Sequence, residues 1–191
     1  MLMVDRISTL FCVIRRVIYK FQFGGYGHKS TIVSPLKIIG KDNIYIGNHV
    51  TIKYKVGLGA TSLKGSDCKL IIEDGCVIGN FNHIFATKEI ILHKNVLTAD
   101  RVYISDNMHG YENIHVPIMH QDVVQKSVVE IGEGSWIGEN VCIIGANIGR
   151  NCVIGANSVV THDIPDYSIA VGVPARVIKQ YDTTINRWRI V

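Results

Sequence analysis

A six-residue repeat runs through most of this sequence and restricts the folds open to it. From residue 131 the chain reads IGEGSW IGENVC IIGAN IGRNCV IGANSV V, with Ile131, Ile137 and Ile143 spaced six residues apart. After one missing residue the same spacing resumes at Ile148 and Ile154. A branched apolar residue at every sixth position predicts short strands that recur at a fixed interval.

Each repeat also carries turn residues and a small residue at fixed places. Glycine follows the branched residue and asparagine recurs at the fourth place, and both tolerate left-handed backbone conformations at little cost. The fifth place holds Ser135, Val141, Cys152 and Ser158. Such a unit predicts a short strand followed by a bend, with small side chains beside large ones in a narrow coil. The template also occurs upstream, at 46, 52 and 58, at 72, 78, 84 and 90, and at 92, 98 and 104.

Hexad periodicity over most of residues 38–164 predicts an all-β fold, a parallel β-helix in which each coil buries its branched residues on its neighbours. A β-sandwich would show alternating apolar and polar residues with hairpin turns, and the chain shows neither consistently. A chain of 191 residues is long enough for one buried domain. We expect an N-terminal helix and lead-in over 1–37, the β-helix over 38–164 with a loop at 105–128, and a C-terminal tail over 165–191.

The N-terminus has the spacing of a basic amphipathic helix. Its apolar and basic residues are Ile7, Leu10, Phe11, Ile14, Val17, Ile18 and Phe21, with Arg6, Arg15, Arg16 and Lys20. Charges interrupt the apolar tract, which is too short to cross a bilayer, and no small-residue cleavage site follows it. We expect this helix to pack on its own domain or on a neighbouring subunit; the alternative is peripheral contact with an anionic membrane surface.

Composition argues against several classes of protein. Hydrophobic residues make up 47% and charged residues 19% of the chain, which disfavours a disordered or fibrous protein. The net charge of +4 comes from scattered basic residues, so nucleic-acid binding has little support. A small anionic ligand would be enough to explain the positive charge. The five cysteines form no CxxC pair, which favours reduced thiols in a cytoplasmic protein. Contact of the N-terminal helix with lipid would place the protein at the inner face of the membrane.

The hexads and the tail VIGANSVVTHDIPDYSIAVGVPARVIK closely resemble the hexapeptide-repeat acyltransferases, in particular their galactoside and maltose O-acetyltransferase branch. The whole chain is also similar to O-acetyltransferases of lipopolysaccharide and capsule biosynthesis. The resemblance covers residues 38–181 and implies coils wound left-handed into a triangular prism. It further implies a homotrimer, with acetyl-CoA as the donor bound in a groove between neighbouring prisms and with no metal.

The segment ISDNMHGYENIHVPIMH, residues 104–120, interrupts the repeat. The chain must leave the prism here, and a long irregular insertion in a compact domain is usually functional. The resemblance places the catalytic histidine near the start of this excursion, at His109 of SDNMHG. Many similar polysaccharide O-acetyltransferases carry a further histidine two residues earlier, where this chain has Asn107.

Acetyl transfer would give the imidazole of His109 a definite task. A sugar hydroxyl is too weak an acid to ionise near neutral pH, so a base must accept its proton as it attacks the thioester. A neutral imidazole, with an unperturbed pKa of about 6.5, suits that task. We expect direct transfer without an acyl-enzyme, since no cysteine is paired with His109 and Cys76 and Cys152 occupy interior places. A backbone N–H at a coil bend would stabilise the developing oxyanion.

The resemblance also implies residues that bind the substrates. Contacts to acetyl-CoA are expected at Glu139, Ala156, Thr161, His162, Arg176 and Lys179, and the last two would meet the phosphates. A solvated tail is the alternative role for that basic pair. Trp136 precedes the bend that carries Glu139, and its alternative role is a packed wall of the prism. Asn80 of GNFNH resembles the asparagine that holds the sugar acceptor, and a structural role at a coil bend is its alternative.

Three other functions fit parts of the sequence. N-acetylation of an amino sugar, perhaps carried on a nucleotide, would use the same base and groove, although no GxGxxG element is present. A carbonic anhydrase-like metal enzyme would draw on His83, His115 and His120, but the last two flank Pro117 in the irregular segment. A scaffold without catalysis is disfavoured because His109 occurs together with the basic tail. We therefore predict an acetyl-CoA-dependent O-acetyltransferase of a cell-surface polysaccharide or its precursor.

Overall fold

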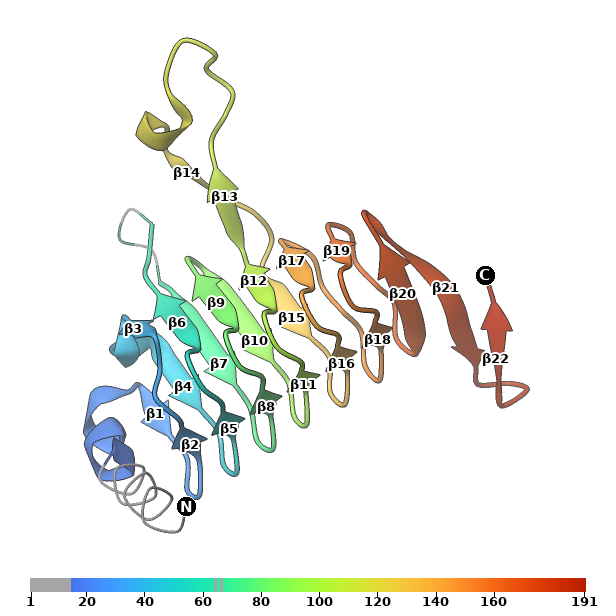
Figure 1. The fold of residues 1–191 in the computed structure, drawn as a ribbon, viewed down its shortest axis with the longest axis horizontal. Helices are drawn as coiled ribbons and strands as arrows, with labels where there is room; N and C mark the ends of the chain where they lie inside the picture. The colour runs from blue at the N-terminus through green and yellow to red at the C-terminus, as the bar shows by residue number, and fades with distance from the viewer. Residues whose placement is uncertain (1–14, 64, 66) are drawn as a thin grey trace, which may run out of the picture.

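The computed structural model describes residues 15–63, 65 and 67–191, which form a stack of three-sided coils (Figure 1). The first five coils each add one strand to each of three sheets, A, B and C, and neighbouring coils pair in parallel. In the later coils Ile148 and Ile164 continue the side of sheet A as isolated bridges. Sheet A contains, in spatial order, β1 (Gly25–Tyr26), β4 (Ile44–Ile46), β7 (Lys69–Ile72), β10 (Glu89–Leu92) and β15 (Val129–Ile131). Sheet C contains β3 (Lys37–Ile39), β6 (Gly57–Ala60), β9 (His83–Ala86), β12 (Tyr103–Ser105), β17 (Cys142–Ile144) and β19 (Val159–Val160).

Sheet B is the largest sheet and continues beyond the last coil. Its coil strands are β2 (Thr31–Ile32), β5 (Thr51–Ile52), β8 (Val77–Ile78), β11 (Leu97–Thr98), β16 (Trp136–Ile137), β18 (Val153–Ile154) and β20 (Ser168–Gly172). Two antiparallel strands follow, β21 (Ala175–Asp182) and β22 (Arg187–Ile190). They form a hairpin at the end of the prism opposite the N-terminus (Figure 1).

We name the edges of the prism by the sheets that they join, as the A–B, B–C and C–A corners. Asparagines turn the chain at several corners in the predicted left-handed conformation, with φ of 59° at Asn140, 48° at Asn151 and 60° at Asn157. Glycine is needed where successive coils touch: a Cβ on Gly138 would lie 2.7 Å from the backbone nitrogen of Ala156. A short 3-10 turn, η1 (Lys41–Asn43), precedes β4.

The core is a column of branched side chains inside the prism. Every position predicted from the hexads is at most 4% exposed, from Ile46 to Val160. The small places are also interior: Ser135, Val141, Cys152 and Ser158 are at most 1% exposed. The two serines bond to the backbone of neighbouring segments, as in the 2.9 Å bond from the Cys152 nitrogen to the Ser135 hydroxyl. The coil core predicted from the repeat is therefore confirmed.

The buried cysteines are core residues with protonated thiols. Cys68, Cys76 and Cys152 are buried, and all cysteines in the described residues are free. Burial raises the pKa of Cys68 to about 11 and that of Cys76 to about 12. Burial also raises the pKa of Cys152. These thiols are therefore poor nucleophiles at neutral pH.

A helix over residues 15–22 packs across the first coil. It buries Tyr19 and, just beyond its end, Phe23, whereas Val17, Ile18 and Phe21 are 57%, 45% and 87% exposed. The apolar face expected from the sequence is thus not the one packed against the prism, because the aromatic pair contacts Tyr26 instead. The earlier part of the predicted helix lies outside the described residues. No helix within the described part of the chain is long and apolar enough to cross a membrane.

Candidate active site

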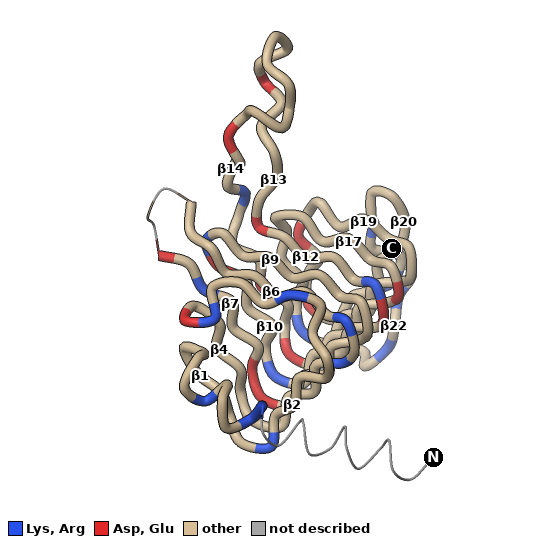
Figure 2. The backbone as a smooth tube through the Cα atoms, turned by 60° about the vertical axis from the view of Figure 1, so that its left-hand side comes forward, with Lys and Arg blue, Asp and Glu red and all other residues tan. Residues whose placement is uncertain are grey.

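An arm leaves the prism at the C–A corner after β12 and returns before β15. It spans residues 107–125 and begins and ends in two antiparallel strands, β13 (Asn107–His109) and β14 (Val123–Gln125). Figure 1 shows it projecting away from the coils, at the break in the repeat. Acidic and basic residues are scattered over the coils in Figure 2, whereas the outer arm carries few of either.

Asp106 fixes the root of this arm. Its carboxylate is fully buried and accepts hydrogen bonds from the backbone nitrogens of Thr87 (2.8 Å), Lys88 (2.7 Å) and Glu89 (2.9 Å). The Asn107 amide donates a further bond of 3.0 Å. Several N–H donors around one carboxylate form a strong, charge-assisted anchor. Sequence reasoning missed this residue, although a carboxylate at the last place before the break was a usable signal.

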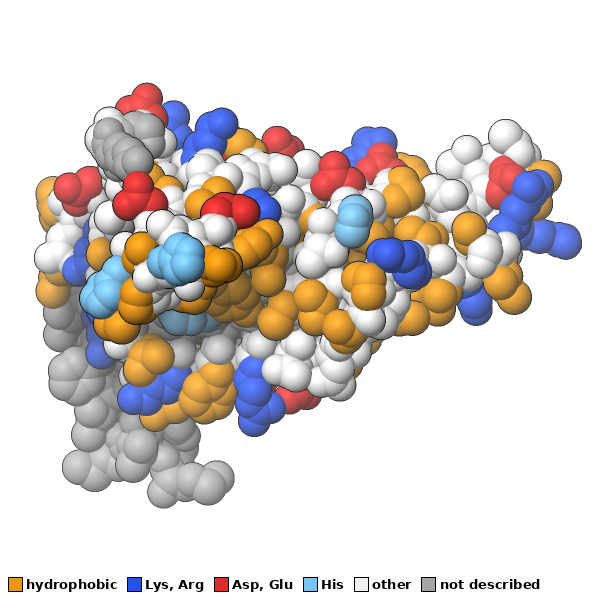
Figure 3. Space-filling view, turned by 90° about the horizontal axis from the view of Figure 1, so that it is seen from above, with side chains coloured by type: hydrophobic (Ala, Val, Ile, Leu, Met, Phe, Trp, Pro, Cys, Tyr) orange, Lys and Arg blue, Asp and Glu red, His pale blue; other side chains and the backbone are white. Residues whose placement is uncertain are grey.

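The outer part of the arm is ordered by its own polar groups. The Gln121 amide donates to the carbonyls of Asn113 (2.9 Å) and Val116 (2.8 Å), next to the 3-10 turn η2 (Ile118–His120). Hydrophobic side chains nevertheless remain uncovered there: Tyr111 is 57%, Ile114 88%, Ile118 49% and Met119 78% exposed. Figure 3 looks onto this edge and shows hydrophobic and histidine side chains gathered on the arm.

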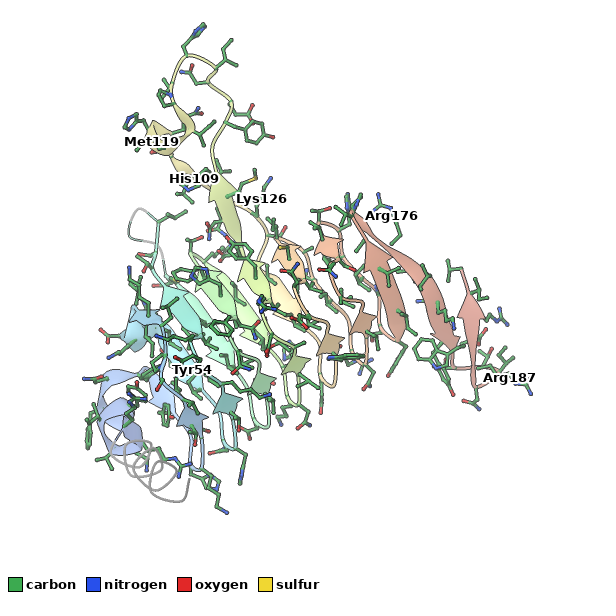
Figure 4. The ribbon with its side chains drawn as sticks, viewed as in Figure 1. Tyr54, His109, Met119, Lys126, Arg176 and Arg187 are labelled. Atoms are coloured by element: carbon green, nitrogen blue, oxygen red, sulfur yellow. The ribbon has the colours of Figure 1, made fainter. Side chains whose placement is uncertain are left out.

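His109 lies on the inner half of the arm. It ends β13, opposite Val123 of β14, and is exposed. Figure 4 shows it close to the base of the arm, near Lys126, with Met119 farther out. No hydrogen bond or ion pair within the described residues engages its ring. The imidazole is therefore free to meet a substrate or a group from another chain.

Four of the residues predicted to bind acetyl-CoA fall into two groups on opposite edges of sheet C. Glu139 and Ala156 lie on successive coils at the B–C corner, where the Asn157 nitrogen bonds the Glu139 carbonyl at 2.9 Å. Thr161 and His162 follow β19 at the C–A corner, the edge that carries the arm. His109, Thr161 and His162 therefore belong to one edge of the chain, whereas Glu139 and Ala156 belong to the opposite edge.

Local contacts involve several of these side chains. Glu139 forms an exposed ion pair with Arg101 on the preceding coil. The Thr161 hydroxyl and His162 Nδ1 lie 3.0 Å apart. Arg176 and Lys179 lie on β21, beyond the last coil and on the outer side of sheet B. Trp136 lies on β16 of sheet B and is 48% exposed.

The side chain of Asn80 ties three coils together at the B–C corner. Its oxygen accepts a 3.1 Å bond from the backbone nitrogen of Tyr54, and its nitrogen donates to the Asp100 carboxylate at 3.0 Å. The hydrogen bonds that Asn80 donates to Asp100, from its side chain first and from its backbone nitrogen, lower the pKa of that carboxyl. Tyr54 itself lies on the body of the prism, away from the arm (Figure 4). The amide has the structural role given as its alternative, and contact with an acceptor stays a prediction.

The three histidines considered for a metal do not converge. His83 lies on sheet C with its ring 4.3 Å from that of Phe85, and partial burial lowers its pKa, whereas His115 and His120 belong to the arm. The described residues contain no group of three His, Cys, Asp or Glu side chains placed to hold a metal ion.

Comparison with known proteins agrees with the repeat. Residues 128–162 match the family model described as the hexapeptide repeat of succinyl-transferase. A probable acetyltransferase of Mycobacterium tuberculosis is 42% identical over 119 residues, which cover 62% of this chain and 39% of that protein. A putative lipopolysaccharide biosynthesis O-acetyl transferase of Escherichia coli is 32% identical over 126 residues, covering 62% of this chain and 64% of its own length. The chain thus spans less than two thirds of either curated relative.

Solved structures show the same architecture. The N-acyltransferase AntD of Bacillus cereus, solved with dTDP and 3-hydroxybutyryl-CoA, superposes with a TM-score of 0.74 at 22% identity and covers 90% of each chain. At that identity the likeness concerns the fold. Together with the repeat match and the three parallel sheets, it confirms the predicted left-handed parallel β-helix.

Proposed function

We propose that this chain, a hexapeptide-repeat protein similar to acetyltransferases, transfers an acetyl group from acetyl-CoA to a sugar hydroxyl of a cell-surface polysaccharide or its precursor. The observation that carries the proposal is the unpartnered imidazole of His109 at the root of an anchored arm, on the same edge as Thr161 and His162. The lipopolysaccharide enzyme among the relatives supports oxygen as the accepting atom.

In this mechanism His109 is the general base. The neutral imidazole takes the hydroxyl proton as the sugar oxygen attacks the thioester carbonyl, and the thiolate of CoA leaves. No described residue engages the ring of His109, so its nitrogens are open to a substrate hydroxyl. Burial raises the pKa of Cys68 and Cys76 and makes these two thiols poor nucleophiles, which supports direct transfer over an acyl-enzyme on either of them.

We infer that the site forms between copies of the chain. The two groups of predicted donor-binding residues lie on opposite edges of sheet C, so one chain offers His109, Thr161 and His162 while a neighbour offers Glu139 and Ala156. Three copies related by a threefold axis would repeat this contact and close the ring. The exposed apolar arm supports such an assembly, because a neighbouring copy would cover it.

The same proposal implies where in the cell the protein acts. Acetyl-CoA as the donor and free thiols favour the cytoplasm, and a membrane-linked glycan precursor would place the protein at the inner face of the membrane. Val17, Ile18 and Phe21 are exposed on the N-terminal helix and are candidates for peripheral contact with that surface.

The test compares two histidines of one arm. We expect His109→Ala to lower turnover by about 10² to 10⁴ while the assembly mass and CoA affinity persist. His115→Ala, farther along the arm, is the matched control and should keep wild-type turnover. CoA release with candidate acceptors provides the assay. A fully active and correctly assembled His109→Ala protein would contradict the assignment.

N-acylation of a nucleotide-linked amino sugar is the second candidate. The N-acyltransferase AntD has the same fold and was solved with dTDP, which is the observation that favours it. Competition between a hydroxyl sugar and a dTDP-linked amino sugar distinguishes the two functions. Faster acetylation of the amine would replace the O-acetyltransferase assignment, whereas transfer to the hydroxyl alone would support it.

A further inference from the structure

The outer face of the C-terminal hairpin carries two cations and two aromatic rings. Arg176 pairs with Val171 and Lys179 with Ile169, residues of β20 that point away from the core. Because side chains alternate along a strand, Tyr181 shares the face of Lys179. Trp188 lies directly opposite Tyr181 on β22, with ring centroids 5.5 Å apart. The ladder register, including a bulge beside Ile169, therefore brings these four side chains to one surface.

The two faces of this hairpin differ in charge balance. On the inner face Arg189 forms an ion pair of 2.8 Å with Asp182. On the outer face neither Arg176 nor Lys179 meets a carboxylate within the described residues, and the Arg176 guanidinium donates only to the Ala175 carbonyl. The outer positive charge is thus available to an anionic ligand.

The aromatic pair next to these cations is open to solvent. Trp188 is 46% exposed and Tyr181 is partly exposed, although large aromatic rings gain most when they are covered. Rings beside unpaired cations suit a ligand that carries both a base and phosphates, because bases stack on aromatic side chains. Figure 4 places Arg176 at one end of this hairpin and Arg187 at the other.

These side chains also occur in the order of the groups in CoA. Ala156 lies on the B–C corner, from which β21 starts with Arg176, followed by Lys179 and then Tyr181. A strand rises about 3.3 Å per residue, so Tyr181 lies roughly 7 Å beyond Lys179. In acetyl-CoA the thioester comes first, the phosphates follow, and the adenine ring is at the far end. The B–C corner, the two cations and the two aromatic rings follow one another along the protein in the same order as these groups of acetyl-CoA.

We propose that Tyr181 and Trp188 hold the adenine ring of CoA, with Arg176 and Lys179 at its phosphates. This inference rests on the proposed function, because it names the residues that recognise the nucleotide end of the same donor. The stacking pair would select donors that carry the adenine nucleotide over shorter pantetheine thioesters.

Fluorescence of Trp188 gives a direct test that needs no turnover. The chain has two tryptophans, so Trp136→Phe leaves Trp188 as the single emitter. We expect saturable quenching of this emission by adenosine 3′,5′-bisphosphate, the nucleotide portion of CoA, and none by 4′-phosphopantetheine. Trp188→Ala and Tyr181→Ala should each weaken bisphosphate and CoA binding about tenfold, or ~1.4 kcal/mol.

Two further variants separate stacking from folding. Trp188→Phe keeps an aromatic ring and should retain most of the affinity, and Ile190→Ala removes an apolar group from the same face and should bind as the wild type does. Circular dichroism checks that each variant is folded. Wild-type affinity in both alanine variants, or tighter binding of thymidine or uridine diphosphate, overturns the inference. If CoA binds while the emission of Trp188 does not change, only this inference is refuted. If CoA does not bind at all, the proposed function is refuted as well.

Discussion

Replacing Asp106 by alanine is expected to cost about 3 to 6 kcal/mol of unfolding free energy. The carboxylate is fully buried and accepts bonds from three consecutive backbone nitrogens, those of Thr87, Lys88 and Glu89, at 2.7 to 2.9 Å. Alanine leaves all three donors without an acceptor, at about 1 to 3 kcal/mol each. We take the lower half of that range because the donors are only partly buried and water can reach some of them.

Asparagine at position 106 should cost less than alanine. Its single oxygen can still accept from Lys88 and Glu89, while its amide can turn toward the hydroxyl of Thr87, which lies 2.9 Å from the present carboxylate. Asp100→Ala is the matched control. That carboxylate bonds the Asn80 nitrogen at 2.8 Å in a half-buried corner, where water can replace it, so a loss of about 1 kcal/mol is expected.

Urea unfolding at a single protein concentration measures the stability order, and limited trypsin digestion reports on the arm. Lys126 lies just beyond β14, so a loosened root should expose its peptide bond to cleavage. We expect Asp106→Ala to be cut faster there than Asp100→Ala. An Asp106→Ala protein as stable and as resistant as the Asp100→Ala control would refute the view that this carboxylate anchors the arm.

Three other predictions concern acid, thiols and close packing. The backbone nitrogen of Asn48 donates to Asp74 and that of Arg150 donates to Asp166, and these bonds are the main reason that the folded pKa of each carboxyl lies below 3.8. The two carboxylates therefore stabilise the fold fully above pH 3.8, and this contribution is lost as the pH falls through their folded pKa values. A melting temperature at pH 3 equal to that at pH 7 would contradict this. Native protein treated with a thiol reagent at pH 8 should leave Cys68, Cys76 and Cys152 unlabelled until it is unfolded, and peptide mapping gives the answer. Gly138→Ala should destabilise the protein by about 1 to 3 kcal/mol, because the added Cβ would press on the backbone of the next coil. Gly25→Ala should cost less, because its Cβ would first meet the Tyr45 ring, at 3.2 Å. Equal losses by calorimetry would show that the coils can move apart.

The N-terminal helix and Asn80 show what periodicity along the chain does not decide. Helical spacing predicted an apolar face at Val17, Ile18 and Phe21, yet Tyr19 and Phe23 are the buried pair. Periodicity identifies an amphipathic helix, but the face that packs depends on the shape it meets, here the ring of Tyr26. Asn80 looked equally suited to a ligand or a bend, and only the positions of Tyr54 and Asp100 on adjacent coils gave its amide a structural use.

The hexads by themselves determined the coil, its buried residues and the place where the chain leaves it, because each of these depends on spacing along the chain: a branched residue every six positions faces inward whatever surrounds it. The grouping of side chains across coils was decided only by the tertiary structure. Sequence separation does not reveal that Thr161 and Ala156 lie on opposite edges of sheet C, or that the register of the last hairpin turns Lys179 and Trp188 to one face. Lateral neighbours are set by how many residues each coil uses and by where a bulge shifts the ladder, and neither quantity can be read from the local pattern.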